Sequence, residues 1–394
     1  MAASCGLLCL TAPRPFAEPA ARPLPTRSVP SEPAATPQSW PIFRGSARQL
    51  GVAPGTLPSR LRLAWRAKIG TGAATSPVVE GGRVYVASGN GILRCLNLAN
   101  GKPVWFVRLG SAVEAAPTLA FGSLLIGAAD GRLYCLEPST GKRRWRYRTE
   151  DRVLGAANVT PTPGGKGFWV VAGSYDYKVH CVDGATGRPV WTYETENYIN
   201  GTPGIGDGYV VAGGCDGNLH VLHLATGHRA RTIEVNNYVA ASSALDGNRV
   251  YIGHYGDTFI CADVVTGSVV WSFKSRGFPF FSSAAVTADR VVVGCRDRRV
   301  HCLRKSDGKP LWDFRARGRV DSSPVVCGGK VVVGSDDGRL YVLDLATGRE
   351  VYSYPIGAPV NTSPAVAGGT VLVGATDGYL YAFKAAGAGE RAGR

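Results

Sequence analysis

The sequence lacks the long apolar segments and the short catalytic signatures that would assign a protein quickly to a class. No apolar run approaches the roughly 18 residues that a membrane-crossing helix needs, so no transmembrane span is expected. There is no P-loop, Rossmann glycine fingerprint, HExxH or GxSxG motif. The stretch GIGDG at 204–208 resembles a phosphate loop, but it separates two strand-like runs and no helix follows it. These absences argue against the common nucleotide-binding enzymes, zinc proteases and serine hydrolases.

The chain also lacks the cysteine pattern of a disulfide framework, although it contains ten cysteines. Other repeats fill one cysteine position with Val221, Val342 or Ala382, so it is a small apolar core position. Equivalent positions on facing sheets lie roughly 10 Å apart, beyond the roughly 7 Å between Cα atoms that a disulfide can span. Free thiols are therefore predicted at five residues: Cys95, Cys135, Cys181, Cys261 and Cys302.

Positive charge is abundant, with a formal net charge of +15, but it is not concentrated. Only 141–148 (GKRRWRYR) and 296–299 (RDRR) are dense in Lys and Arg. A nucleic-acid-binding protein usually gathers such residues on one face. The pattern favours a solvated basic surface and argues against a nucleic-acid partner.

The first forty residues are rich in Ala, Pro and Arg and differ from the rest of the chain. Residues 2–12 have the apolar character of the central part of a signal peptide, but no basic segment precedes them. Export to the periplasm or cell envelope is the first interpretation. A truncated start, an organellar transit segment and a disordered tail in a cytoplasmic protein remain alternatives.

What the sequence has in abundance is a repeat. Trp65, Trp105, Trp145, Trp191, Trp271 and Trp312 recur at intervals of about 40 residues, with Arg231 and Tyr352 at the two remaining positions. A period near 40 residues with strand-like content is typical of β-propeller blades.

Each unit reads as four short antiparallel strands. In the first unit the strand-like runs are 76–80, 83–88, 92–97 and 103–108, separated by Gly-Gly, Asn-Gly and Asn-Gly pairs. Eight first strands are found, but the last unit lacks a fourth strand. The isolated strand at 61–70 would complete it and close the ring. We therefore predict an all-β fold, a single eight-bladed propeller at 59–388. A tail at 1–39, a lead-in linker at 40–58 and a C-terminal tail at 389–394 would flank it.

The repeated motif L-D-x-x-T-G-x-x-x-W resembles the docking repeat of quinoprotein-type, PQQ-binding-like β-propellers. Asp183, Thr186, Gly187 and Trp191 carry the resemblance in one blade, and WPIFRG at 40–45 is similar to the lead-in of bacterial members. Trp on an outer strand packs against the next blade, so the motif is expected to be structural. The predicted docking residues are Trp65, Trp105, Trp145, Trp191, Trp271, Trp312 and Tyr352.

Within this family, the length and the ring without insertions are similar to BamB, the outer-membrane assembly lipoprotein. This resemblance implies a non-catalytic scaffold or binding protein in a cell-envelope assembly. It implies an unidentified protein partner and no cofactor, and we expect a monomeric ring.

The resemblance also implies an alternative, a dehydrogenase that holds pyrroloquinoline quinone (PQQ) and Ca²⁺ over the channel. Glu114 and Asn158 are the ligand types that Ca²⁺ prefers, and Asp321 is the candidate base. The adjacent Cys-Cys pair, a stacking Trp in the mouth loops and the long insertions of such enzymes are all missing.

The loops that enter the first strands and the turns between second and third strands should surround one mouth of the channel. Aromatic residues gather there in blades three to six. They either pack the loops together or form a recognition surface for a partner. The candidate binding residues are Tyr175, Tyr198, Tyr238, His254, Tyr255 and Phe280.

Overall fold

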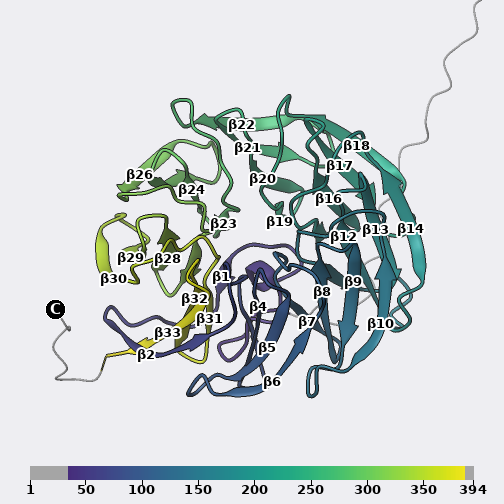
Figure 1. The fold of residues 1–394 in the computed structure, drawn as a ribbon. Helices are drawn as coiled ribbons and strands as arrows, with labels where there is room; N and C mark the ends of the chain where they lie inside the picture. Colours follow the sequence, from purple (N-terminus) through teal and green to yellow (C-terminus); the bar gives the residue numbers. More distant parts are fainter. Residues whose placement is uncertain (1–33, 387–394) are drawn as a thin grey trace, which may run out of the picture.

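A computed structural model describes residues 34–386 of the chain. They form eight sheets arranged as blades around a central axis (Figure 1), which confirms the predicted eight-bladed propeller. None of the described residues belongs to a helix of the length and apolarity that crossing a membrane requires. Residues 1–33 of the expected tail at 1–39, and the whole expected C-terminal tail at 389–394, lie outside the described part.

The blades are numbered along the chain, and each is given from its innermost strand outward. The first four blades are blade 1, β3 (Val78–Glu80), β4 (Arg83–Ala87), β5 (Ile92–Asn97) and β6 (Pro103–Arg108); blade 2, β7 (Thr118–Ala120), β8 (Ser123–Ala128), β9 (Arg132–Leu136) and β10 (Arg143–Arg148); blade 3, β11 (Asn158–Pro161), β12 (Phe168–Gly173), β13 (Lys178–Asp183) and β14 (Pro189–Glu194); and blade 4, β15 (Gly204–Gly206), β16 (Tyr209–Gly213), β17 (Asn218–His223) and β18 (Arg229–Glu234).

The other four are blade 5, β19 (Ala244–Asp246), β20 (Arg249–Gly253), β21 (Thr258–Asp263) and β22 (Val269–Lys274); blade 6, β23 (Ala285–Val286), β24 (Arg290–Cys295), β25 (Arg299–Arg304) and β26 (Pro310–Arg315); blade 7, β27 (Val325–Cys327), β28 (Lys330–Ser335), β29 (Arg339–Asp344) and β30 (Glu350–Pro355); and blade 8, β31 (Ala365–Ala367), β32 (Thr370–Gly374), β33 (Tyr379–Ala385) and β2 (Leu61–Lys68).

Burial follows position in the blade. The three inner strands are apolar on both faces because neighbouring blades cover them, whereas outer strands such as β6 and β22 are largely exposed. The repeated cysteines lie in this core as free, buried thiols, as predicted. The ring is closed by antiparallel pairing of β2 with β33, from Leu61 opposite Ala385 to Lys68 opposite Tyr379, with a one-residue register shift between Leu63 and Trp65.

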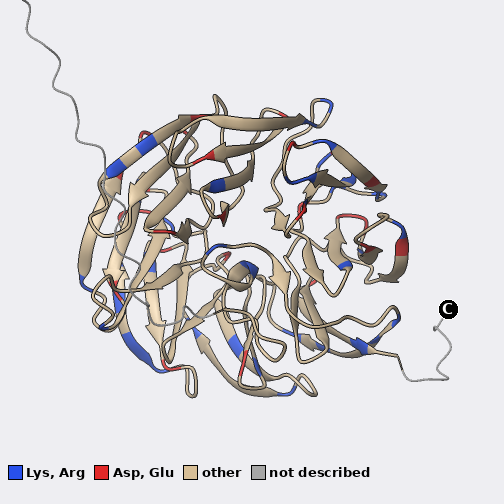
Figure 2. Cartoon of the chain, turned by 180° about the vertical axis from the view of Figure 1, so that it is seen from behind, with Lys and Arg blue, Asp and Glu red and all other residues tan. Residues whose placement is uncertain are grey.

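Charged residues are distributed around the whole ring. Figure 2 shows Lys and Arg on several blades, both on outer strands and in turns, with Asp and Glu interspersed among them. The net positive charge of the chain is therefore spread over the surface of the propeller.

The outer-strand tryptophans lie against the following blade. The Trp191 indole covers Gly227 of blade 4 and its Nε1 donates to Leu224 O at 2.9 Å. Gly227 has φ +71 and no room for a Cβ beneath the ring, so glycine is needed at this turn. The same arrangement holds for the other outer-strand tryptophans: Trp65, Trp105, Trp145, Trp271 and Trp312.

Two blades depart from tryptophan, and the contacts explain both. Arg231 reproduces the indole's hydrogen bond, because its Nε donates to Val265 O at 2.9 Å. Tyr352 of blade 7 faces blade 8, whose third and fourth strands β33 and β2 come from opposite ends of the chain. No turn with a docking glycine joins those two strands, so a tryptophan at 352 would have nothing equivalent to cover.

The segment expected to be a linker instead packs inside the ring. It contains a short 3₁₀ turn, η1 (Phe43–Gly45), and β1 (Val52–Ala53), which pairs in parallel with β27. Both lie near the centre of the ring (Figure 1). We call residues 40–53 the plug.

The plug runs along the inner strands and pairs their free backbone N–H groups. These edge strands would otherwise present unpaired N–H groups inside the ring, and a buried unpaired N–H group is costly. The carbonyl acceptors in the plug and their donors are Trp40 O from Val79, Pro41 O from Leu119, Ala47 O from Ile205, Arg48 O from Leu245, Leu50 O from Val286 and Gly51 O from Val326.

Arg44 is the centre of the plug. It is 1% exposed and donates to Ser323 O, Ala284 O and Pro324 O at 3.1, 2.9 and 2.6 Å. Burial lowers its pKa to about 9, so it stays charged at neutral pH. Three carbonyls of blades 6 and 7 therefore compensate a cation that has no carboxylate partner among the described residues.

Candidate functional site at the mouth of the central funnel

The plug converts the central channel into a blind funnel. A cavity of about 220 Å³ has Phe43 of the plug in its wall, together with Glu114, Asn200, Asp321 and Asn361. These four polar residues lie on the loops that enter the first strands of blades 2, 4, 7 and 8. We call the open side of this cavity the mouth.

A girdle of hydroxyl groups sets the register of the mouth loops. The backbone N–H of Ala156 donates to Thr202 Oγ1, that of Thr202 to Ser242 Oγ, and that of Ser242 to Ser283 Oγ, at 2.9 to 3.0 Å. Each bond joins one blade to the next. The girdle position of a blade is the residue that takes part in these bonds, such as Ala156, Thr202 or Ser242. The side chain that lines the funnel lies two residues before it.

This register corrects the expectation for blade 3. Its lining residue is Leu154, two residues before Ala156, and not Asn158. Asn158 is fully buried: its Nδ2 donates to Ala47 O and Pro203 O, and its Oδ1 accepts from Val159 N. The side chain therefore anchors the plug.

Asp321, the candidate base, is tied into an ion pair. Arg296 Nε and Nη2 donate to its two carboxylate oxygens at 2.9 and 2.8 Å. The guanidinium also lies 3.6 Å from the centre of the Phe281 ring. The arginine that stacks on Phe281 therefore occupies both carboxylate oxygens of Asp321 with hydrogen bonds.

The residues present do not fit a PQQ and Ca²⁺ site. Of the two expected ligands, Glu114 lines the funnel, but the side chain of Asn158 is hydrogen-bonded to the plug. Apolar Leu154 lies at the corresponding position of the funnel wall. The remaining carboxylate of the wall is neutralised by Arg296. No chemical step through that cofactor follows from this geometry.

Four of the six predicted recognition residues lie together at the mouth. Tyr175 and Tyr198 stack with ring centres 4.6 Å apart, and the Tyr175 hydroxyl donates to Asn200 Oδ1. Tyr238 contacts Tyr255 edge to face at 6.3 Å, and Tyr255 contacts Phe281 at 4.9 Å. The two groups belong to blades 3 to 6, as expected.

The other two predicted residues lie inside the molecule. Phe280 is 1% exposed and packs against Phe259 and Phe273 in the core of blades 5 and 6. His254 is buried, which lowers its pKa, and its Nδ1 accepts from Gly256 N at 3.0 Å. A one-residue offset along a loop reverses which side chain faces solvent, and spacing within a single loop does not reveal it.

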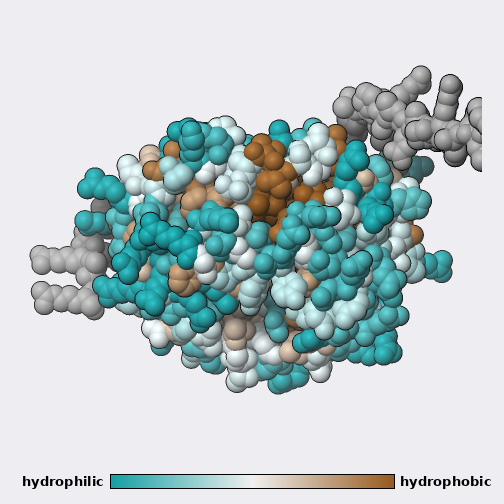
Figure 3. All heavy atoms as spheres, turned by 90° about the horizontal axis from the view of Figure 1, so that it is seen from above, coloured by the Kyte–Doolittle hydropathy of each residue, from teal (hydrophilic) through white to brown (hydrophobic). Residues whose placement is uncertain are grey.

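Phe278 belongs to the aromatic cluster expected on this face but is not among the six candidate binding residues, and it is 47% exposed. It stands four residues after the end of its outer strand, at the position of Tyr198 and Tyr238 in the two preceding loops. Alignment of the eight mouth loops would have found this row. Figure 3 shows a largely hydrophilic surface with one compact apolar cluster over the blades at the top of Figure 1. Val265, Val269 and Val270 are exposed at or just before the start of the outer strand β22, and Phe278 is exposed in the loop after its other end.

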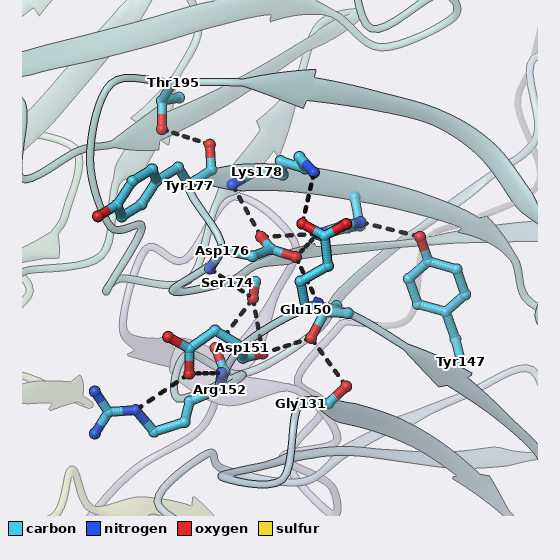
Figure 4. Close-up of polar contacts among 12 residues, drawn as sticks. Gly131, Tyr147, Glu150, Asp151, Arg152, Ser174, Asp176, Tyr177, Lys178 and Thr195 are labelled. Carbon is cyan, nitrogen blue, oxygen red and sulfur yellow. Dashed lines mark hydrogen bonds and ion pairs between the residues drawn. The ribbon is translucent and has the colours of Figure 1, made fainter.

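Histidine–aspartate pairs stiffen several mouth turns. His180 Nε2 lies 3.0 Å from Asp176, while the Tyr147 hydroxyl lies 3.0 Å from His180 Nδ1. Asp176 also accepts from Glu150 N, so the pair fixes the loop at 150–152 (Figure 4). A second pair joins His220 and Asp216 at 2.8 Å.

A third such pair has a cysteine beside it. Cys295, Asp297 and His301 place one donor atom each within 4.8 Å of one another. Blades 3 and 4 keep the Asp–His pair with Ser174 and Gly214 at the cysteine position, so the pair does not require a metal. Burial raises the pKa of Cys295 to about 12, which opposes the thiolate that a metal needs. We interpret this cluster as a structural turn.

Three solved structures share the fold. BamB from Moraxella catarrhalis is 19% identical with a TM-score of 0.69, over 84% of this chain and 100% of the other. The quinohemoprotein alcohol dehydrogenase from Comamonas testosteroni is 16% identical with a TM-score of 0.74, over 91% and 82%. The computationally designed Ika8 protein is 19% identical with a TM-score of 0.74, over 82% and 100%. At these identities the likeness shows the fold alone.

No curated protein sequence matches the chain significantly. The family model described as outer membrane protein assembly factor BamB matches residues 61–272 and 266–392. These two segments together cover nearly all of the propeller. The chain therefore belongs to the BamB family of PQQ-like β-propellers.

Proposed function

We propose that this protein is a non-catalytic propeller of the cell envelope that docks a protein partner on its mouth. The observation that carries the proposal is the row of Tyr198, Tyr238 and Phe278, which are 37, 56 and 47% exposed. Large aromatic side chains left in water on consecutive loops are typical of the energetic centre of protein interfaces. The family name, an outer membrane assembly factor, supports both the binding role and the location.

The topology leaves the mouth open to a partner. β33 is a third strand and ends on the side of the third-to-fourth turns, which is the plug side. Pro37 contacts Gly368 in a first-to-second turn on that same side. Both ends of the described chain therefore emerge away from the aromatic row.

The polar groups of the funnel wall support binding over catalysis. The pairs Arg296–Asp321 and Tyr175–Asn200 are already satisfied within the chain. A general base needs a free lone pair within reach of a substrate proton. Glu114 is an exception, because it is an exposed carboxylate of the funnel wall that forms no ion pair with the described residues.

The test is affinity capture from the native organism with the triple variant Tyr238→Ser, Tyr255→Ser and Phe278→Ser. We expect it to lose the captured partner at an unchanged melting temperature. Phe106→Ser is the matched control, because Phe106 is 55% exposed but lies on the outer strand β6. Equal capture by the triple variant and the wild type would refute the docking role.

A second measurement addresses catalysis. Addition of PQQ with Ca²⁺ is expected to leave the melting temperature and the visible spectrum of the cofactor unchanged. A thermal shift that Glu114→Ala abolishes would contradict the non-catalytic proposal.

A further inference from the structure

We propose that the partner seated on the mouth is a second copy of this chain, in a face-to-face dimer whose two-fold axis passes over Tyr238. The inference rests on the proposed docking function of the mouth, names its occupant, and departs from the monomeric ring expected from the sequence. It is carried by a symmetry in the charges of the mouth loops, which are built from equivalent positions of successive blades.

The aromatic row marks the centre of that symmetry. Tyr198, Tyr238 and Phe278 occupy the same position in the loops between blades 3 and 4, 4 and 5, and 5 and 6. Tyr238 is the middle residue and the most exposed of the three, at 56%. A two-fold axis over Tyr238 would place Tyr238 on its copy and Tyr198 on Phe278 of the other molecule.

The charged residues of the same loops change sign across this centre. The loop after blade 3 carries exposed Glu194 and Glu196, and the loop after blade 5 carries exposed Lys274 and Arg276 at the same two positions. One step further out the change of sign is weaker: Glu150 and Arg317 stand at equivalent positions, but Glu150 pairs with Lys178, and the strand ends Arg148 and Arg315 are both basic. Within residues 34–386 the side chains of Glu194, Glu196, Arg276 and Arg317 take part in no ion pair.

A two-fold axis lying in the plane of the ring reverses the order of the blades in the second copy. The loop after blade 3 then faces the loop after blade 5, and the loop after blade 2 faces the loop after blade 6. Glu194 and Glu196 then face Lys274 and Arg276 on both sides of the axis, and the aromatic row meets itself, while Glu234 of the middle loop faces its own copy. Self-complementarity of one patch is the requirement for an isologous dimer, and oppositely charged flanks set its orientation.

The surface is also shaped for this contact. A cavity of about 660 Å³ beside Tyr238 is lined by Glu196, Asp216 and Glu234, with several asparagines. In the proposed dimer it faces the partner loop that carries Lys274 and Arg276. The overall charge of +15 opposes association of two copies. At physiological salt this repulsion is screened beyond roughly 8 Å, so the local pairing of acidic and basic loops decides the outcome.

The test reverses each sign separately and then combines the variants. The acid-reversed variant is Glu194→Lys with Glu196→Lys, and the base-reversed variant is Lys274→Glu with Arg276→Glu. Sedimentation velocity of the full chain over a concentration series measures self-association. All four side chains are exposed, so melting temperatures should equal that of the wild type.

We expect the wild type to dimerise and its dissociation constant to rise roughly tenfold or more between 0.05 and 0.5 M NaCl, as screening weakens the flanking pairs. Each variant alone should be monomeric at concentrations where the wild type is a dimer. An equimolar mixture should restore the dimer, because the only pairing left brings acidic loops onto basic ones. Lys102→Glu with Lys142→Glu is the control: it makes the same charge change in exposed third-to-fourth turns on the plug side, away from the mouth, and should leave the dimer intact.

A monomeric wild type, a dimer indifferent to both reversals, or a mixture that fails to associate would each overturn the inference. These results are distinct from failure of the proposed function. If the wild type is monomeric but the aromatic triple variant loses a captured protein, the docking role stands and the occupant of the mouth is another protein. If the wild type is monomeric and the triple variant captures as much protein as the wild type, both proposals are refuted.

Discussion

The plug is the feature most directly testable by stability, and Gly51→Ala probes it. Gly51 has φ +66, and a Cβ there would lie 2.6 Å from Arg44 Cζ and closer still to Nη2. The guanidinium would have to move away from Ala284 O and Pro324 O, which Nη2 holds at 2.9 and 2.6 Å. The substitution therefore disrupts the hydrogen bonds at the centre of the plug while residue 44 remains an arginine.

The expected magnitude has two parts. A non-glycine residue in left-handed backbone costs about 1 to 2 kcal/mol. Loss of two hydrogen bonds from a charged donor costs about 1.5 to 3 kcal/mol each. Gly51→Ala should therefore lower the free energy of unfolding by about 4 to 8 kcal/mol, combining these two parts.

Gly81→Ala separates the two parts. Gly81 has φ +57, and no atom lies within 4 Å of the point that a Cβ would occupy, so only the backbone cost of about 1 to 2 kcal/mol applies. The assay is urea denaturation of both variants followed by tryptophan fluorescence. Equal midpoints for the two variants would show that Arg44 is not held as described, and the role assigned to the plug would be wrong.

Two further predictions concern the blades. Arg231→Trp should raise the melting temperature by a few degrees, because the new indole would cover Gly267 as the indoles of other blades cover their turn glycines. Differential scanning fluorimetry measures the change. A lower melting temperature would show that the site has adapted to arginine. The second concerns pH. Burial alone would raise the pKa of Asp176, but hydrogen bonds from His180 and backbone amides outweigh it and hold the pKa below its ordinary value of 3.8. A depressed carboxyl pKa adds stability above the unfolded-state pKa and loses it as pH falls through the folded-state pKa, so the free energy of unfolding should drop below about pH 4. Asp176→Asn should flatten that decline between pH 5 and 3; an unchanged slope would contradict the assignment.

The architecture is predictable from the chain because its determinants are local and repeated. The strand runs at 83–88, 92–97 and 103–108 match β4, β5 and β6 to within one residue. Closure by the segment at 61–70 is predictable as well, since an unfinished last blade and an isolated first strand complete each other. Equivalent signals in eight units reinforce one another.

The site is less predictable, and the errors have one physical cause. Counting three residues back from the Pro or Ser anchor of each first strand assigns Asn158 to the funnel, but Pro161 of blade 3 lies five residues after its girdle position and Pro203 of blade 4 only one. The structure therefore places Leu154, four residues earlier, in the wall. In the same way Phe278 stands at the surface where Phe280 is expected. Both errors concern loops, in which no hydrophobic period marks the side that faces solvent.

By itself the sequence determined the number of blades, their four-stranded form and the contacts that join them, because these depend on short spacings repeated along the chain. Only the tertiary structure decided what occupies the centre of the ring. Arg44 is separated from its acceptor Ser323 by 279 residues, and no local sequence pattern predicts a contact over that separation. The same holds for the opposed charges about Tyr238, which become a surface only when the ring has brought the loops to one face.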